Sequence, residues 1–210
     1  MKRKRGFFIV FEGGEGTGKS TQMALLVRWL KQQRVSVLVT LEPGGTKIGS
    51  QIRKILLNHH FDHLSSRAEL FLYQADRAQH VDEVIVPALK AGKIVISDRF
   101  SDSSLVYQGM CRGLGVEWTG QLNQFATGGL LPDLVIILDV AEKIAFRRLQ
   151  KRKTLDRLER EKKAFHRKVR RGFLELARKY PKRFAVVDTA FDRLAVFNEV
   201  KQIVSERVGL

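Results

Sequence analysis

The residues with the most distinctive chemistry form a glycine-rich segment near the N-terminus, Gly13-Gly14-Glu15-Gly16-Thr17-Gly18-Lys19-Ser20. It matches the pattern GxxxxGK[ST] at every fixed position, and such a segment binds nucleotide phosphates when it joins a buried strand to a helix. That context is present, because the apolar run Phe7–Phe11 predicts a strand before it and Ser20–Lys31 predicts a helix after it. The alternative is a glycine-rich turn that contains a lysine by chance, and the flanking elements argue against it.

The segment predicts a site for ATP and magnesium. Glycines let successive backbone N–H groups converge on phosphate oxygens, and the N-terminus of the helix adds partial positive charge. We expect Lys19 to reach the β- and γ-phosphates and the Ser20 hydroxyl to ligate Mg²⁺, with Thr21 completing the nucleotide contacts.

Polar loops follow the next two predicted strands. Glu42-Pro43-Gly44-Gly45-Thr46 is a shaped turn, and Arg53 lies eight residues beyond Gly45, where it could reach a phosphate or remain a surface charge. Asp98 ends the following strand, a position that suits a carboxylate holding Mg²⁺ through water. Arg99 beside it offers a fork of N–H donors to a second phosphate group.

A further group of side chains could form a nucleobase pocket. Ser104, Tyr107 and Gln108 share one face, at spacing i, i+3 and i+4, if a helix starts near Asp102. Tyr73 and Arg77 lie four residues apart on a predicted helix, and offer a ring that can stack on a base and a guanidinium that can donate to a carbonyl oxygen. The alternatives are an N-cap cluster for the first group and a core position for Tyr73.

Composition limits the class of protein. A chain of 210 residues can bury one full sheet core, and we expect a single domain over residues 1–210. No stretch approaches the roughly 18 apolar residues of a membrane span, and the basic start at Lys2–Arg5 precedes an apolar run too short for a signal peptide. Cys111 is the single cysteine, which suits a reducing compartment. We therefore expect a cytoplasmic protein without a membrane partner.

The net charge of +16 is concentrated in one part of the chain. Residues 143–183 contain 18 Lys and Arg against 4 Asp and Glu, and the segment Lys2–Arg5 is entirely basic. A block of this kind could bind nucleic acid, cover nucleotide phosphates as a lid, or form a solvated helix face. We expect a few of these arginines to be functional, most to be solvated, and nucleic acid not to be a partner.

Short apolar runs alternate with helical patterns along the chain. Strands are expected at Phe7–Phe11, Val35–Leu41, Lys93–Ser97, Leu134–Asp139 and Phe184–Val187. Helices are expected at Thr21–Gln33, Ile48–Leu57, Ser66–Ala91, Glu117–Thr127, Glu142–Lys151, Arg157–Tyr180 and Arg193–Val208. Nearly continuous β-branched runs are typical of strands buried on both faces, so we predict an α/β fold with a doubly wound, five-stranded parallel sheet. Ligands then bind at the carboxyl ends of the strands, where the polar loops lie.

The combination of motifs resembles that of bacterial thymidylate kinases over nearly the whole chain. The motifs are Phe11-Glu12-Gly13-Gly14-Glu15-Gly16-Thr17-Gly18-Lys19-Ser20, Glu42-Pro43-Gly44-Gly45-Thr46, Asp98-Arg99-Phe100 continuing to Ser103-Ser104 and Tyr107-Gln108-Gly109, and Leu155-Asp156-Arg157-Leu158-Glu159. A phosphate loop alone fits many ATPases and GTPases, whereas the four motifs in this order are highly specific. The resemblance implies transfer of the ATP γ-phosphate to dTMP, a P-loop fold with a mobile lid at about residues 147–160, and a homodimer.

The resemblance also implies roles for individual residues. Glu15 corresponds to a carboxylate that accepts from the deoxyribose 3′-OH near Mg²⁺, which would join Ser20 and Asp98 at the metal. Arg53 and Arg99 correspond to the arginines that hold the dTMP phosphate. Tyr73 stands in place of a phenylalanine that stacks on thymine, and Arg77 in place of an arginine that bonds a base carbonyl. Ser104 and Gln108 fall at positions on the base edge, and Tyr107 at an aromatic that crowds the sugar 2′ position.

The resemblance implies a catalytic arginine, which one branch of the family carries in the phosphate loop and the other in the lid. The phosphate loop contains none between Glu15 and Thr17, so this chain resembles the branch with the arginine in the lid. Arg152 aligns best, with Arg148 and Arg157 as neighbours that could take its place. The expected catalytic set is then Lys19, Arg99, Arg152 and Glu15. One departure from the family is Leu41, where arginine often precedes the Glu-Pro-Gly-Gly turn. The alternatives in function are a kinase for another nucleoside monophosphate and an ATPase stimulated by nucleic acid.

Overall fold

Five parallel strands form the centre of the structure, a computed structural model that describes residues 6–150 and 155–210. The strands are β1 (Phe7–Glu12), β2 (Val37–Leu41), β3 (Ile94–Asp98), β4 (Leu134–Asp139) and β5 (Phe184–Asp188). They are ordered β2-β3-β1-β4-β5, so β1 is the central strand, with Phe7 opposite Ile94 of β3 and Ile9 opposite Leu134 of β4. The predicted doubly wound, five-stranded parallel sheet is confirmed.

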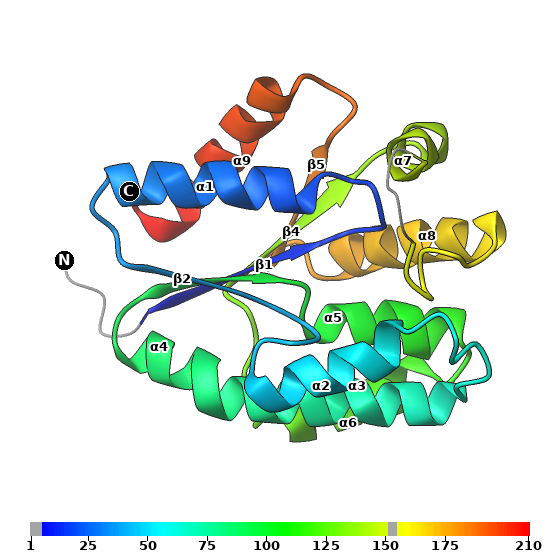
Figure 1. The fold of residues 1–210 in the computed structure, drawn as a ribbon. Helices are drawn as coiled ribbons and strands as arrows, with labels where there is room; N and C mark the ends of the chain where they lie inside the picture. Colours follow the sequence, from blue (N-terminus) through cyan, green and yellow to red (C-terminus); the bar gives the residue numbers. More distant parts are fainter. Residues whose placement is uncertain (1–5, 151–154) are drawn as a thin grey trace.

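Helices cover both faces of this sheet (Figure 1). They are α1 (Lys19–Gln32), α2 (Lys47–Leu57), α3 (Ser66–His80), the π-helical turn η1 (Val81–Ile85), α4 (Val86–Lys90), α5 (Ser101–Ser104), the π-helical segment η2 (Leu105–Cys111), α6 (Val116–Thr127), α7 (Glu142–Leu149), α8 (Lys163–Lys179) and α9 (Arg193–Val208). Within the two described ranges, every helix is too short or too polar to span the hydrocarbon core of a bilayer.

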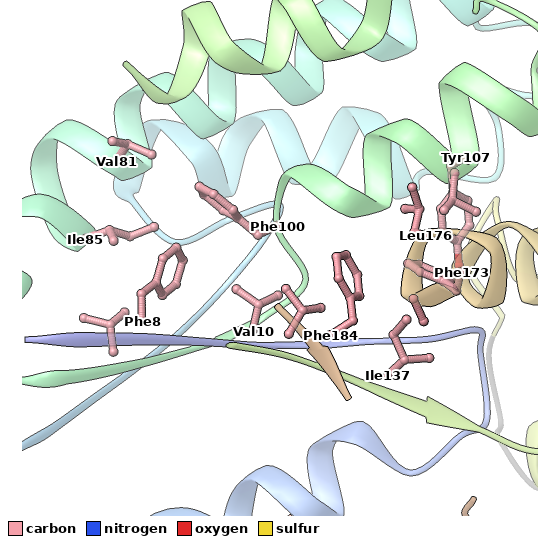
Figure 2. Packing of buried hydrophobic residues seen from close by; sticks show 14 of the residues in the cluster. Phe8, Val10, Val81, Ile85, Phe100, Tyr107, Ile137, Phe173, Leu176 and Phe184 are labelled. Atoms are coloured by element: carbon pink, nitrogen blue, oxygen red, sulfur yellow. The ribbon is translucent and has the colours of Figure 1, made fainter. Parts of the chain in front are cut away.

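Two apolar cores lie on opposite faces of the sheet. On one face α1 and α9 bury side chains such as Leu26 and Val200 against β1, β3 and β4. On the other face, shown in Figure 2, Phe8 and Ile137 of the sheet pack below Phe100 and below Phe173 of α8. Residues 8 to 11 of β1 are fully buried, which explains why that run is continuously apolar.

The order of strands places a binding crevice at one end of β1. The chain leaves β1 toward β2 on one side and reaches β4 on the other side, so loops diverge at the carboxyl end of this central strand. A crevice at such a switch point is where ligands bind in open parallel sheets. The glycine-rich segment and the loop after β3 both lie there (Figure 1).

Many predicted boundaries differ from the observed ones, mostly by one or two residues, such as the start of α1 at Lys19 instead of Thr21, and two of the differences have a clear physical cause. The strand expected from Val35 begins at Val37, because Arg34 adopts a left-handed φ of 59° and the Val35 N–H still bonds to Leu30 O of α1 at 3.0 Å. The helix expected from Arg157 begins at Lys163. Before it, Asp156 Oδ1 accepts the N–H groups of residues 158 and 159, each at 2.9 Å, and thereby stabilises a turn instead of a helix.

The helix predicted over Ser66–Ala91 is nearly continuous, from α3 through η1 into α4, with one π-helical turn. That turn lies directly before the sequence Val86-Pro87, where proline cannot donate a backbone hydrogen bond. The helix predicted over Glu142–Lys151 corresponds to α7, which is described to Leu149. Its predicted end, Lys151, lies outside the described residues.

Candidate active site

A cavity of about 420 Å³ lies at the carboxyl ends of β1, β2 and β3. Its walls come from the glycine-rich loop, from the turn after β2, from α2 and α3, and from the segment after β3. The predicted site residues that line it are Glu15, Gly16, Thr17, Gly18, Lys19, Ser20, Thr21, Arg53, Tyr73, Arg77, Asp98, Arg99, Ser104, Tyr107, Gln108 and Arg148. The structure therefore brings together side chains that are separated by up to 133 residues.

The glycine-rich loop has the geometry of a phosphate-binding loop. Gly13, Gly16 and Gly18 have positive φ angles of 131°, 73° and 94°, which side-chain-bearing residues rarely adopt. A Cβ on Gly13 would lie 2.4 Å from Leu138 O, so the loop also needs glycine for its close approach to β4. The loop can therefore turn its backbone N–H groups toward one point.

Lys19 is buried beneath this loop. Its Nζ donates to Gly13 O at 3.1 Å and to Gly14 O at 2.9 Å. Burial and, secondly, the nearby Arg99 guanidinium lower the pKa of Lys19, while Glu15 acts in the opposite sense. The ammonium group is held by carbonyl oxygens that phosphate oxygens could replace.

Arg99 crosses from the end of β3 to the phosphate loop. Its backbone has a left-handed φ of 70°, and its N–H bonds to Phe11 O of β1 at 2.9 Å. The guanidinium forms an ion pair with Glu15, donates to Gly13 O at 3.1 Å and lies 5.3 Å from the centre of the Tyr107 ring. Burial lowers its pKa, but Glu15 and the other acidic neighbours outweigh this effect and raise the pKa well above the usual value. Arg99 is therefore a permanent cation facing the cavity.

Glu12, which the motif analysis assigned no role, supports Arg99 from below. It is fully buried at the end of β1, and accepts the N–H groups of Phe100 and Ser103 at 3.0 and 3.1 Å and the Ser103 hydroxyl at 2.6 Å. Desolvation raises its pKa to about 7, although Arg99, 3.8 Å away, acts in the opposite direction. Glu12 thus fixes the loop that carries Arg99. Its place directly before the phosphate loop gave no sign of this role, because its partners lie 88 and 91 residues away.

Arg53 reaches the cavity across the turn after β2. Its Nη1 donates to Pro43 O at 2.6 Å, and a Cβ on Gly44 would lie only 2.9 Å from its Cδ. Gly44 has a φ of 114°, so glycine is required both for the backbone conformation and for the passage of Arg53. The prediction of a shaped turn is explained by this packing.

Arg77 lies at the floor of the cavity, 1% exposed. Its Nε donates to Glu42 at 2.9 Å, and its Nη1 donates to Ser104 Oγ at 3.0 Å and to Asn123 Oδ1 at 2.9 Å. Its Nη2 donates to Phe100 O at 3.2 Å. Since carboxylate, hydroxyl, amide and carbonyl acceptors surround it, the orientation of this guanidinium is fixed without a ligand.

Glu42 is the centre of a buried chain that the sequence did not reveal. It pairs with Arg77 at 2.9 Å and, through its other oxygen, with His80 Nδ1 at 3.0 Å, whose Nε2 lies 2.6 Å from Thr40 Oγ1. Asp76 is next to this chain, and burial together with Glu42 raises its pKa to about 6. The only sequence signal for these contacts was the position of Glu42 in the turn motif.

The side chains predicted to form a base pocket lie close to one another. The helix predicted near Asp102 starts at Ser101, and the first turn α5 continues into η2, which carries Tyr107 and Gln108. The Tyr107 hydroxyl donates to Glu15 Oε1 at 3.3 Å, and burial raises its pKa. Tyr73 packs against the apolar core that contains Phe8 and Phe173, and it also lines the cavity. Both predictions for Tyr73, a core position and a place in the base pocket, therefore describe it.

The three lid arginines differ in position. Arg148 of α7 donates to Gly16 O at 3.3 Å and to Thr189 O at 2.8 Å, which places it against the phosphate loop. Arg157 does not line the cavity; its Nη2 lies 2.6 Å from Glu69 Oε2 and its Nε donates to Leu56 O at 2.9 Å. Arg152, the best-aligned candidate for the catalytic arginine, lies outside the described residues.

Part of the basic block forms ion pairs away from the cavity. Arg183 pairs with the buried Asp102 at 3.1 Å, and Arg170 bonds to Asp139 at 2.7 Å. Together with the pair formed by Arg157, these contacts show that some of the excess positive charge anchors the C-terminal segment to the rest of the fold. This structural role was not among the three interpretations of the charge.

The residues expected at magnesium fit a metal held largely by phosphates and water. Ser20 and Asp98 both line the cavity, and Asp98 Oδ1 is buried with no hydrogen-bond partner in the described part of the chain. Among residues 6–150 and 155–210, no group of three or more His, Cys, Asp or Glu side chains could hold a metal unaided. One carboxylate, one hydroxyl and the nucleotide phosphates are the donor set that Mg²⁺ commonly uses.

The parallel sheet, its switch-point crevice and the loop closing over Lys19 define a P-loop nucleotide-binding protein. The thymidylate kinase family model matches residues 11–200. A thymidylate kinase from Thermoanaerobacter sp. strain X514 is 45% identical over 202 residues, covering 96% of this chain and 98% of that protein. One from Clavibacter sepedonicus is 48% identical over 197 residues, covering 93% of each.

A solved structure agrees with these relatives. The crystal structure of thymidylate kinase from Ehrlichia chaffeensis superposes with a TM-score of 0.78 at 32% identity, covering 95% of this chain and 98% of that one. The chain belongs to the thymidylate kinase family and is an ATP-dependent kinase. The resemblance seen in the motifs is therefore confirmed.

Proposed function

We propose that this kinase transfers the γ-phosphate of ATP to dTMP, giving dTDP, with the cavity described above as the place of reaction. The single observation that carries the proposal is the position of Arg99. It is held at the phosphate loop by Gly13 O and Glu15, within one cavity with Lys19 on one side and Tyr73 and Arg77 on the other. A cation between a phosphate-binding loop and a pocket with stacking and hydrogen-bonding groups suits the phosphate of a second nucleotide.

The donor side would consist of the phosphate loop. Residues Gly13, Gly14, Glu15, Gly16, Thr17, Gly18, Lys19, Ser20 and Thr21 would bind ATP, with Lys19 exchanging Gly13 O and Gly14 O for phosphate oxygens. Magnesium would be held by Ser20 and Asp98 with Glu15 nearby, and when bound it neutralises charge on the β- and γ-phosphates.

The acceptor side would hold the attacking oxygen in line. Arg53 and Arg99 would bind the dTMP phosphate, which needs no general base because its second pKa of about 6 leaves it largely dianionic at pH 7. Glu15 would accept from the 3′-OH, and Tyr107, fixed between Glu15 and the Arg99 guanidinium, would lie against the sugar. Catalysis then comes from alignment and from positive charge on the transferred group.

The base would lie between Tyr73 and the floor of the cavity. Arg77 would donate to the O4 of thymine in exchange for one of its present acceptors, such as Ser104 Oγ at 3.0 Å, and Ser104 or Gln108 would lie at the neighbouring edge of the base. Cytosine has an amino group where thymine has O4, so its donor would face the fixed guanidinium, and leaving such groups unpaired costs about 1–3 kcal/mol or more.

A mobile lid at about residues 147–160 would supply the remaining charge and exclude water during transfer. Arg152 remains the proposed catalytic arginine. Arg148, which contacts the phosphate loop, is the alternative within the described residues. Arg157 is directed toward Glu69 and Leu56, so a holding role suits it better.

We also propose a homodimer formed by one domain per chain, in the cytoplasm, where the single cysteine fits the reducing conditions. Leu70, Val81 and Ile85 of α3 and η1 are at most 2% exposed and pack in the core, so they are not available to a dimer surface. The exposed apolar groups on the adjacent helices α2, α3 and α6 are Ile48, Ile55, Phe71, Val116, Trp118 and Phe125. Phe125 is 90% exposed, and a two-fold interface through these helices would cover it.

A coupled assay of ADP release over a panel of monophosphates tests the proposed function. Turnover should be greatest with dTMP, lower with dUMP, and low with dCMP, CMP and AMP. Efficient phosphorylation of CMP or dCMP would contradict the base pocket, and stimulation of ATP hydrolysis by DNA in the absence of a monophosphate would favour the nucleic-acid-dependent ATPase.

A further inference from the structure

Glu69 is a buried carboxylate of α3 to which no role has been assigned. It is 0% exposed, in the first turn of that helix, and three side chains from different parts of the chain converge on it. Gln108 Nε2 donates to Oε1 at 2.7 Å, Arg157 lies 2.6 Å from Oε2, and Arg112 lies 3.4 Å from both oxygens. Because two guanidinium groups surround it, this carboxylate is a charged acceptor with no donor of its own.

The Glu69 contact determines how the Gln108 amide is oriented. An amide side chain has one accepting oxygen and one donating nitrogen, and a carboxylate can only accept. Gln108 must therefore turn its nitrogen to Glu69. Its oxygen then has no hydrogen-bond donor within residues 6–150 and 155–210, while Gln108 lines the cavity beside Arg77 and Ser104. The cavity thus receives an acceptor at this position and not a donor.

We propose that Glu69 is a positioning residue that selects the base by fixing the Gln108 amide with its oxygen toward the ligand. This inference rests on the proposed function, since it names how the same cavity recognises its substrate. Thymine and uracil carry an N–H at ring position 3, next to O4, and cytosine carries an unprotonated, accepting nitrogen there. A fixed acceptor on Gln108 matches the first two bases and opposes the third.

The two arginines make the orientation sensitive to one atom of Glu69. In Glu69→Gln the new amide must offer its oxygen to Arg157 and Arg112, because neither guanidinium can accept. Its nitrogen then faces Gln108, whose amide turns over to accept from it and presents its own nitrogen to the cavity. The variant therefore replaces an acceptor by a donor at the base without adding or removing a heavy atom.

The test measures kcat/KM of Glu69→Gln for dTMP, dUMP and dCMP. The ratio of kcat/KM for dTMP to that for dCMP should fall by about tenfold or more, mainly through KM. In the variant the N–H of thymine loses its acceptor and faces a donor, whereas the accepting nitrogen of cytosine gains a donor. The ratio of dTMP to dUMP should stay within about twofold, because both bases carry the same N–H and differ only in a methyl group. General loosening of the pocket would change both ratios.

Glu161→Gln is the matched control. It removes the other carboxylate partner of Arg112, at 2.7 Å, and leaves the contact between Glu69 and Gln108 intact, so both ratios should remain those of the unmodified enzyme. Glu69→Asp, which keeps an acceptor-only carboxylate, should retain most of the discrimination against dCMP. If Glu69→Gln does not melt cooperatively, Gln108→Met tests the step on which the role of Glu69 depends, because it removes the amide while leaving Glu69 with its arginines; the ratio of dTMP to dCMP should again fall.

The outcomes separate the two proposals. If the unmodified enzyme fails to phosphorylate dTMP, the proposed function is wrong and this inference is lost with it. If the unmodified enzyme prefers dTMP while folded Glu69→Gln, or Gln108→Met in its place, keeps the ratio of dTMP to dCMP, only the role of Glu69 is overturned.

Discussion

Substitution of Arg99 by alanine is the most direct test of the acceptor site. The guanidinium bonds to Gly13 O and pairs with Glu15, and its side chain is 16% exposed, so the structure holds it in place before any ligand binds. Loss of one preorganised donor to a transition state costs about 10²-fold in kcat or more. Loss of a charged hydrogen bond to the acceptor phosphate costs about 1.5–3 kcal/mol, which is roughly tenfold or more in KM for dTMP.

The expected result for Arg99→Ala is therefore a fall in kcat/KM for dTMP of about 10³-fold, with binding of ATP retained. Steady-state kinetics and titration with a fluorescent ATP analogue measure the two effects separately. Arg178→Ala is the matched control, because it removes the same charge from an exposed position on α8 that does not line the cavity. Near-normal turnover of Arg99→Ala, or an equal loss in the control, would refute the assignment of the acceptor site.

Four further predictions concern the donor side, the lid, the dimer and pH. Lys19→Ala should lower kcat by about 10²-fold or more, measured by ADP release, since it removes charge at the transferred phosphate. Arg152→Ala should lower kcat strongly and leave dTMP affinity nearly intact; if it is silent while Arg148→Ala is inactive, the position of the catalytic arginine is wrong. Phe125→Asp should convert a dimer into a monomer at micromolar concentration by light scattering, and an unmodified chain that is already monomeric would contradict the interface. The pKa of Glu12 is raised from 4.5 to about 7, so the folded state binds this proton more tightly than the unfolded state does. The free energy of unfolding should therefore fall as the pH rises from about 4.5 to 7, by up to about 3 kcal/mol from this group. Urea titrations across this pH range should show a smaller fall for Glu12→Gln than for the unmodified chain.

The sequence was sufficient to predict the fold, because the patterns that identify the strands and the phosphate loop lie within short stretches of the chain. Continuous apolar runs identified all five strands, and a phosphate loop between a strand and a helix fixed the carboxyl edge of the sheet as the binding side. The late starts of β2 and α8 had causes that depend on neighbouring residues: the left-handed Arg34 delays β2, and Asp156 stabilises a turn before α8. Residue types alone did not distinguish these turns from the adjoining strand or helix.

The candidate site was predictable only for groups that face the ligand. Arg53, Arg77 and Arg99 lie in or directly after recognisable motifs or helices, and all three line the cavity. The carboxylates behind them were not found, because Glu12, Glu42 and Glu69 act on partners up to 91 residues away. A buried carboxylate has no periodicity or spacing of its own, so its role becomes visible only when its partners are known.

These three carboxylates share one physical function. Burying a charge is costly unless it is paired, and replacement of such pairs by apolar groups is often neutral for stability, so stability alone does not account for them. Each one instead fixes a group that faces the cavity: Glu12 the loop of Arg99, Glu42 the guanidinium of Arg77, and Glu69 the amide of Gln108. Groups fixed before the substrate arrives need no reorganisation when charge shifts during transfer, so their interaction energy can lower the barrier to reaction. Substitution of any of the three should therefore change rate or selectivity more than the affinity for ATP.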